Sequence, residues 1–182
     1  MKKTLMIVAA MAACFGADAQ GKYFTRDGHI KFFSSTPVED IEADNHKVTV
    51  VLDESTGKLE FAAVIKSFEF EKALMQEHFN ENYMESKIYP KSTFKGEVKD
   101  FADQSFDSDV EVLAVGQLSM HGVTNDLEIP GTIKKDSEGY TLTSKFMLKP
   151  EDYKIEIPNT VRDKIAKKVE VTIECKLDPL KK

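Results

Sequence analysis

The chain has 182 residues, of which 31% are charged and 41% are hydrophobic, and its formal net charge is −6 at pH 7. This length is enough to bury the core of one domain. The acidic balance argues against a nucleic-acid partner and against anionic lipid headgroups, because like charges repel.

The beginning of the chain has the pattern of an export signal. A basic start precedes an apolar run over residues 4–13, and the tripeptide Ala-Asp-Ala at 17–19 fits a cleavage site. We therefore expect a signal peptide over residues 1–19 and a periplasmic or secreted domain over residues 20–182. No apolar stretch is long enough to cross a bilayer as a helix, so we expect no integral membrane segment in the mature chain.

The chain contains two cysteines, Cys14 and Cys175. Cys14 follows two alanines, and its lipidation as a lipoprotein is the alternative processing route. If Cys14 leaves with the signal peptide, Cys175 has no partner for an internal disulfide. Its place at an apolar position of a strand pattern indicates a small core residue.

Eight segments alternate apolar and polar side chains with a period of two, the pattern of a strand that buries one face. In chain order they cover residues 30–34, 48–52, 59–65, 94–98, 110–120, 127–133, 140–148 and 169–177. Clusters rich in Gly, Asn, Asp and Ser separate several of them and fit hairpin turns. Residues 37–45 are less regular and fit either a further strand or a loop.

One segment, residues 71–84, has a helical period instead. Leu74, Met75, Phe79 and Tyr83 recur there at spacings that place them on one side of a helix. The segment therefore predicts one short amphipathic helix between the third and fourth strands.

Consecutive hairpins favour an antiparallel meander, and one apolar phase in all eight strands requires a shared interior. Two stacked sheets or one closed sheet would provide it. The long strand over 110–120 favours closure, which also removes exposed strand edges. Pro130 lies inside the sixth strand and indicates a bulge or an edge there, because proline cannot donate to the ladder. We predict an all-β fold, an eight-stranded antiparallel barrel with one short helix.

The interior of such a barrel is either solid or leaves room for one slender ligand. Taken alone, the residues favour a solid core, because protein interiors are close-packed. In the hollow case we expect a ligand-binding wall of inward apolar residues and a cap at one end. The wall would be Phe32, Val50, Phe61, Phe94, Leu118, Leu142, Phe146 and Ile173, and the cap would be Phe68, Leu74 and Phe79. Tyr140, Ser144 or a lysine at the rim is a candidate for holding a polar headgroup.

The sequence lacks the signatures of an enzyme. Its four histidines, His29, His46, His78 and His121, form no H-E-x-x-H and no other close pair with metal-ligand spacing. Motifs for a nucleophilic serine or a bound nucleotide are absent, and Ser119 near His121 has no orienting acid. We expect His121 to form hydrogen bonds within its hairpin, and we expect no catalytic residues, no metal and no cofactor.

A few apolar residues fall on the outward phase of the strands. They are Val51, Val64, Leu113 and Val115. They would form the face of a homodimer or lie beneath the helix.

Two stretches carry a family resemblance. Residues 73–96, ALMQEHFNENYMESKIYPKSTFKG, and residues 116–124, GQLSMHGVT, are similar to a helix with its following strand entry and to a hairpin of the YceI-like family. The His-rich, Gly-containing opening of many members is absent at residues 31–36. The resemblance implies a lipocalin-like barrel, periplasmic or secreted, that binds a polyisoprenoid or similar lipid.

The resemblance therefore favours the hollow interior. It predicts a non-enzymatic, exported protein that holds a long-chain apolar or amphiphilic ligand, an isoprenoid or another lipid, inside the barrel. The alternative is a ligand-free structural or protein-interaction barrel of the cell envelope.

Overall fold

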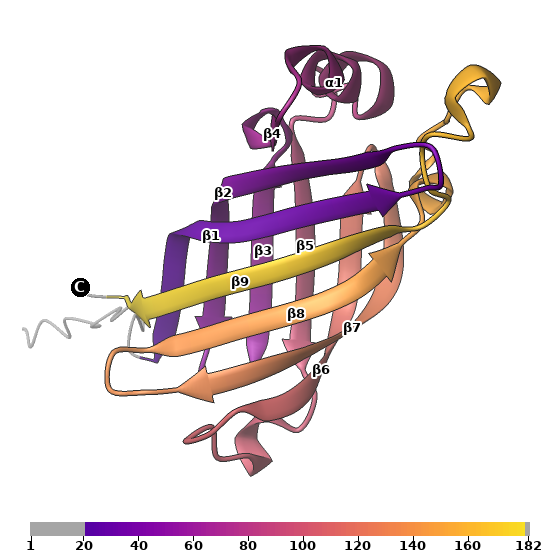
Figure 1. The fold of residues 1–182 in the computed structure, drawn as a ribbon. Coiled ribbons are helices and arrows are strands. Elements are labelled where there is room, and N and C mark those ends of the chain that lie inside the picture. Colours follow the sequence, from indigo (N-terminus) through magenta and orange to yellow (C-terminus); the bar gives the residue numbers. More distant parts are fainter. Residues whose placement is uncertain (1–20, 181–182) are drawn as a thin grey trace, which may run out of the picture.

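The computed structural model describes residues 21–180, so the predicted signal peptide and Cys14 lie outside the described residues. Within that range the strands of one sheet (Figure 1) are β1 (Lys22–Ser35), β2 (Asp40–Asp53), β3 (Lys58–Val64), β4 (Glu69–Phe70), β5 (Lys91–Val98), β6 (Val110–Met120), β7 (Val123–Lys135), β8 (Tyr140–Leu148) and β9 (Val169–Pro179). The helical elements are α1 (Ala73–His78), the π-helical turn η2 (Phe79–Tyr83), and the 3-10 turns η1 (Ile65–Ser67), η3 (Phe101–Asp103), η4 (Pro150–Tyr153) and η5 (Asn159–Val161).

The predicted barrel is confirmed. Each long strand runs antiparallel to its neighbours in the chain, and β1 pairs with both β2 and β9 to close the sheet. The very short β4 only extends one end of β2. Closure in this order gives most of each long strand a partner on both sides, and the part of β7 before Gly131 is paired with β6 alone.

The irregular stretch over residues 37–45 is mostly strand. β2 begins at Asp40, and the preceding turn is held by the Thr36 backbone N–H, which donates to the Glu39 carbonyl at 3.1 Å. The apolar alternation of β2 is interrupted at Asn45, an inward position that is polar and fully buried. Its side-chain amide donates to the Val64 carbonyl at 3.0 Å, so the buried polar group is satisfied.

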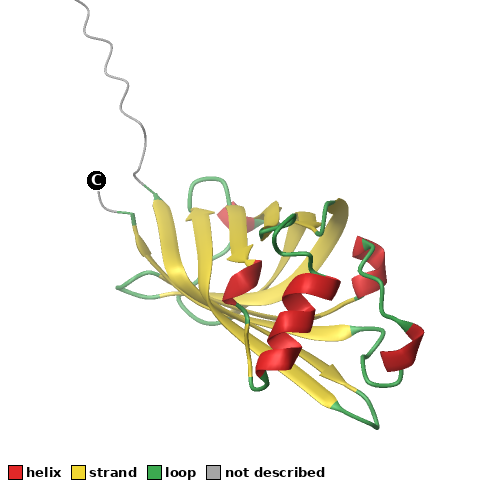
Figure 2. Ribbon diagram, turned by 90° about the horizontal axis from the view of Figure 1, so that it is seen from above, coloured by secondary structure: helices red, strands yellow, loops and turns green. Residues whose placement is uncertain are grey.

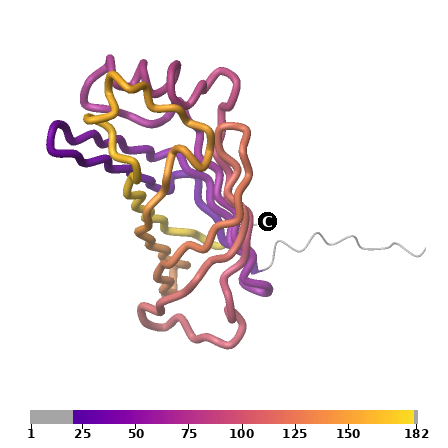
Figure 3. The backbone as a smooth tube through the Cα atoms, turned by 90° about the vertical axis from the view of Figure 1, so that its right-hand side faces the viewer, coloured from indigo at the N-terminus to yellow at the C-terminus, as the bar shows by residue number. Residues whose placement is uncertain are grey.

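The helix predicted over residues 71–84 is present as α1 continued by η2. Both lie across one end of the barrel rather than along its outer wall (Figure 2). The segment after β8, drawn in orange in Figure 3, approaches the same end. None of the described helices is long and apolar enough to cross a membrane.

Pro130 lies where β7 loses one of its two neighbours. On the β6 side it pairs with Leu113, but on the β8 side the ladder ends one residue away, at Gly131 opposite Ser144. The expected local edge is therefore present. In the gap between β7 and β8, the Asn125 side chain donates to the carbonyl of Asp152 in η4 at 2.8 Å.

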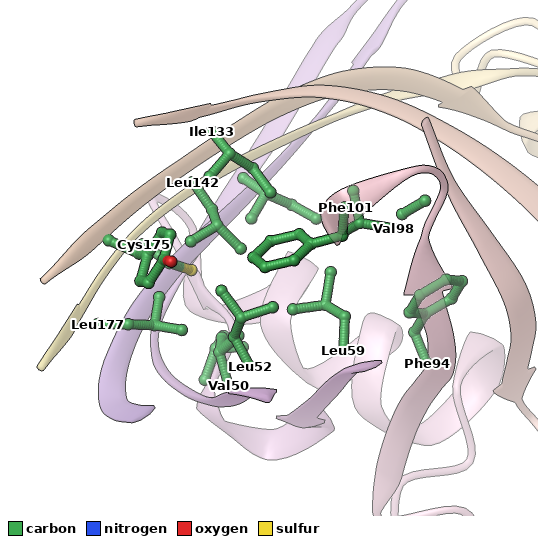
Figure 4. Packing of buried hydrophobic residues seen from close by; sticks show 14 of the residues in the cluster. Val50, Leu52, Leu59, Phe94, Val98, Phe101, Ile133, Leu142, Cys175 and Leu177 are labelled. Atoms are coloured by element: carbon green, nitrogen blue, oxygen red, sulfur yellow. The ribbon is translucent and has the colours of Figure 1, made fainter. Parts of the chain in front are cut away.

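The apolar core is divided between the two ends of the barrel. Away from the helix, Leu52, Phe101, Tyr140 and Leu177 belong to a packed cluster that fills the interior (Figure 4 shows part of it). A second, smaller cluster lies at the helix end and contains Ala43, Ile65, Phe68, Met84, Tyr153 and Ile155. The two ends of the interior therefore differ, and the region where they meet holds the candidate site.

Candidate functional site

A cavity of about 560 Å³ occupies the helix-covered half of the barrel. Pockets for small apolar molecules have volumes of roughly 300–1,000 Å³. Most of the lining side chains are aliphatic or aromatic, and all eight long strands contribute at least one of them from their inward phase. On β7 these residues are Ile129 and Ile133. The close-packed interior that the residues alone favoured is therefore present only in the other half of the barrel.

The structure brings together nearly all of the residues that the sequence assigned to a wall and a cap. The residues that line the cavity are Phe32, Phe61, Phe68, Leu74, Phe79, Phe94, Leu118, Leu142, Phe146 and Ile173. Val50 is the exception: it belongs to the packed cluster, and neighbouring side chains bury it fully although its strand partner Phe61 lines the cavity. Whether the other residues contact a ligand stays a prediction.

The cap is an aromatic cluster beneath the helix. Phe79 of η2 stacks on Phe32 of β1, with ring centroids 5.6 Å apart. Phe68 and Phe70 flank the same ring, with centroids 5.5 Å and 5.0 Å from that of Phe79. Contacts of this kind stabilise the position of the helix over the barrel end beyond the area they bury.

A second segment, which was not predicted from the sequence, also covers the cavity. Residues between β8 and β9 line the cavity through Ile155, Ile157, Val161 and Ile165. Ile155 and Ile157 are two residues apart, whereas Ile157, Val161 and Ile165 are four apart, so no single period runs through the segment. The segment is fixed to the barrel where the Ala166 backbone N–H donates to the Ser34 hydroxyl at 2.9 Å.

The cavity reaches the surface between these two covering segments. Its lining includes the exposed side chains of Lys72 and Leu74 at the start of α1 and of Lys164 after η5. Lys72 Nζ lies 3.5 Å from Glu39 Oε1 across this rim. The mouth is therefore polar and charged around an apolar interior, the arrangement expected for an amphiphile.

One polar group inside the cavity lacks a partner. Ser92 lines the cavity, and its Oγ is buried without a hydrogen bond to any described residue. Burying a hydroxyl without a hydrogen-bond partner costs free energy, and a hydrogen bond to a ligand would recover that cost. Ser144 differs, because its hydroxyl donates to the Pro130 carbonyl at 2.6 Å. Ser92 is therefore the lining residue best placed to receive a polar atom of a ligand.

Tyr140, the other candidate for a headgroup, lies in the packed half instead. Its hydroxyl donates to Glu54 Oε1 at 2.8 Å, and Lys135 Nζ donates to the same oxygen. Burial and the neighbouring Glu54 carboxylate raise the pKa of Tyr140 above its ordinary value. Tyr140 thus has a structural role: it donates a hydrogen bond to the Glu54 carboxylate at the packed end of the barrel.

The residues considered for chemistry do not assemble a nucleophilic site. His121 does not contact Ser119: its Nδ1 lies 3.0 Å from the Tyr153 carbonyl and its Nε2 lies 2.9 Å from Glu85 Oε2. The expectation that its hydrogen bonds stay within the hairpin is therefore wrong, and the ring instead links that hairpin to η4 and to the segment after η2. Burial raises the pKa of the Cys175 thiol to about 12, so this thiol is not a nucleophile at neutral pH.

Two histidines distant in the sequence do meet. The rings of His29 in β1 and His46 in β2 stack with centroids 4.3 Å apart. No local spacing rule detects this pair, because strand pairing rather than a helical turn brings the residues together.

Comparison with known proteins supports the fold. The family model described as YceI-like domain matches residues 20–177. A polyisoprenoid binding domain from Saccharophagus degradans, implicated in plant cell wall breakdown, has a TM-score of 0.76 at 14% identity, covering 88% of this chain and 99% of that one. BcnA of Burkholderia cenocepacia has a TM-score of 0.68 at 14% identity, covering 82% and 94%. The Campylobacter jejuni YCEI protein has a TM-score of 0.56 at 16% identity, covering 100% and 91%. No curated protein matches the sequence.

Proposed function

The chain belongs to the YceI-like domain family, and from that membership we propose that it is an exported binding protein that holds a long-chain isoprenoid or other lipid inside its barrel. The observation that carries the proposal is the cavity of about 560 Å³ lined by inward aliphatic and aromatic side chains. The solved domain from Saccharophagus degradans with this fold is described as polyisoprenoid binding, which supports the same ligand class.

The hydrophobic effect supplies the affinity for such a ligand. Each methylene moved from water into the cavity contributes about 0.8 kcal/mol before the cost of ordering the chain. A multi-isoprene tail therefore binds without any strong polar contact. The charged mouth and the Ser92 hydroxyl favour a ligand with a small polar group over a pure hydrocarbon. The protein holds the ligand and performs no chemistry on it.

The first test is mass spectrometry of organic extracts from the purified protein, followed by titration of the extracted protein with geranylgeraniol. We expect a co-purified lipid and saturable binding of the added isoprenoid alcohol. A folded protein that yields no lipid and takes up no geranylgeraniol would instead favour the ligand-free interaction barrel.

A matched pair of variants on β6 locates the binding in the cavity. Leu118 lines the cavity, whereas Gln117 beside it is exposed on the outer wall. Leu118→Trp fills the interior and should weaken geranylgeraniol binding at least tenfold, about 1.4 kcal/mol. Gln117→Trp adds the same bulk outside and should leave binding unchanged. Equal affinities in two folded variants would place the ligand elsewhere.

A further inference from the structure

The outer wall of the barrel carries a local irregularity between β1 and β2. Gly28 pairs with Val48 and Ile30 pairs with Asn45, so the single residue His29 lies opposite two residues of β2, one of them His46. A bulge of this kind re-aims side chains, and bulges occur often beside functional sites. Here the bulge places two imidazoles against each other.

The side chains around this bulge have the geometry of a metal-ligand set. The rings of His29 and His46 are nearly parallel, with an interplanar angle of 10°. Asp44 Oδ1 lies 2.7 Å from His29 Nε2. One ligand atom from each of the three residues lies within 4.8 Å of the others. Two ligands of a tetrahedral zinc ion are about 3.4 Å apart, a spacing that rotation of the exposed His46 side chain reaches.

A fourth residue fits the surroundings of such an ion. Glu174 of β9 lies directly opposite His29 in the sheet, and its Oε2 is 3.9 Å from His29 Nδ1. Histidines that bind metals commonly donate their other ring N–H to a carboxylate, which orients the ring. The two carboxylates also provide negative charge against a dication.

We propose that His29, His46 and Asp44 form a surface site for a divalent transition-metal ion of the zinc type, which joins β1 to β2 on the outside of the barrel. Two imidazoles and one carboxylate prefer zinc, copper or nickel to magnesium or calcium. Three protein ligands leave a position for water. The site is independent of the lipid cavity, because Ile30 lines the cavity and the neighbouring His29 faces the opposite side of the wall.

The test is calorimetric titration of the purified protein with Zn²⁺, with Ca²⁺ as a parallel probe. We expect one Zn²⁺ per chain, no heat with Ca²⁺, and a rise in Tm on adding Zn²⁺ that a chelator reverses. His46→Gln should weaken Zn²⁺ binding by at least tenfold. Removing only a residue that hydrogen-bonds to a metal ligand already lowers metal affinity by about tenfold or more. His78→Gln is the matched control, because His78 is an exposed histidine on α1, away from the bulge.

Circular dichroism of His46→Gln shows whether the variant is folded, so that loss of a metal ligand is distinguished from loss of the fold. Zinc binding to any other group of the protein would be the same in all variants and would cancel in the comparison. Electron paramagnetic resonance of the Cu²⁺-loaded protein should report two nitrogen ligands, with one lost in His46→Gln. The proposal is overturned if Zn²⁺ binds the folded His46→Gln variant as it binds the parent protein. It is also overturned if neither probe binds, in which case His29 and Asp44 form a hydrogen bond only.

Discussion

The Ser144 hydroxyl donates a hydrogen bond to the Pro130 carbonyl, 2.6 Å away, at the point where strands β7 and β8 separate. Beyond this point each of the two strands keeps only one ladder neighbour. The side chain thus supplies a bond at the place where the backbone ladder ends.

Ser144→Ala should therefore loosen the barrel wall at the separation. The Pro130 carbonyl loses its donor, so we expect the free energy of unfolding to fall by about 1 kcal/mol. Urea denaturation measures the change. Thr143→Ala is the control on the same strand, because Thr143 is exposed, and its effect should be smaller. If the two variants have equal stability, this hydrogen bond does not hold the two strands.

Ser92 provides a test of ligand orientation that rests on the proposed function. Its hydroxyl lines the cavity without a partner among the described residues. Ser92→Ala should weaken binding of geranylgeraniol by about 1 kcal/mol, because a hydrogen bond to the ligand is lost. Binding of phytane, a branched hydrocarbon of similar length, should not weaken. A parallel loss for both ligands would show that Ser92 acts on the shape of the cavity instead.

Cys175 should be inert in the folded protein. Its side chain is buried, and burial raises the pKa of the thiol from 9.0 to about 12. A disulfide reagent at pH 8 should modify it only in denaturant, because the thiolate is the reactive form. Rapid modification of the native protein would contradict the buried position.

The same shift in pKa gives a dependence of stability on pH. The folded state keeps the proton of Cys175 where the unfolded thiol loses it. This contribution to stability is fully present below pH 9 and is lost as the pH rises towards 12. Cys175→Ala should reduce that loss of stability between neutral and alkaline pH, measured by urea denaturation across the range.

Glu54 should contribute stability at neutral pH and none in acid. Burial raises the pKa of its carboxyl, but hydrogen bonds from Lys135 and Tyr140 outweigh burial, so the pKa lies below its ordinary value. A lowered folded-state pKa stabilises the protein above the unfolded value of 4.5, and this stabilisation is lost as the pH falls. Glu54→Gln should lower the free energy of unfolding by about 1 kcal/mol at pH 7, because the site is partly exposed to solvent.

The comparison that isolates this effect is with Glu138→Gln. Glu138 pairs with Lys176, and both side chains are more than half exposed, so this substitution should have little effect at any pH. The difference between the two variants should be present at pH 7 and disappear near pH 3. A difference that persists in acid would mean that packing rather than charge accounts for the loss.

Processing of the chain is tested by the intact mass of the exported protein. Cleavage after Ala19 gives a chain that begins at Gln20, whereas the alternative route gives a lipidated chain that begins at Cys14. We expect the unlipidated mass in the periplasmic or secreted fraction. A lipidated mass in the membrane fraction would establish the alternative.

The eight strands could be predicted because each buries one apolar face against a common interior. The hollow could not be predicted in this way, because Phe61 beside the cavity and Val50 in the packed half have the same inward phase. Val50 and Phe61 are even direct partners in the sheet. Alternation determines which face a residue occupies but contains no information on how closely other side chains fill the interior around it. Contacts between residues far apart in sequence, such as His29 with His46 or His121 with Glu85, depend on strand register and on bulges.

Both ends of the described chain lie together at the packed end of the barrel. The Leu180 backbone N–H donates to the Lys22 carbonyl at 2.8 Å, and the Glu54 backbone N–H donates to the Gly21 carbonyl at 2.7 Å. The cavity mouth is at the opposite end, beside α1. Anything fused before residue 21 or after residue 180 therefore attaches at the packed end, and a tether at either terminus leaves the α1 end of the barrel facing away from the anchor.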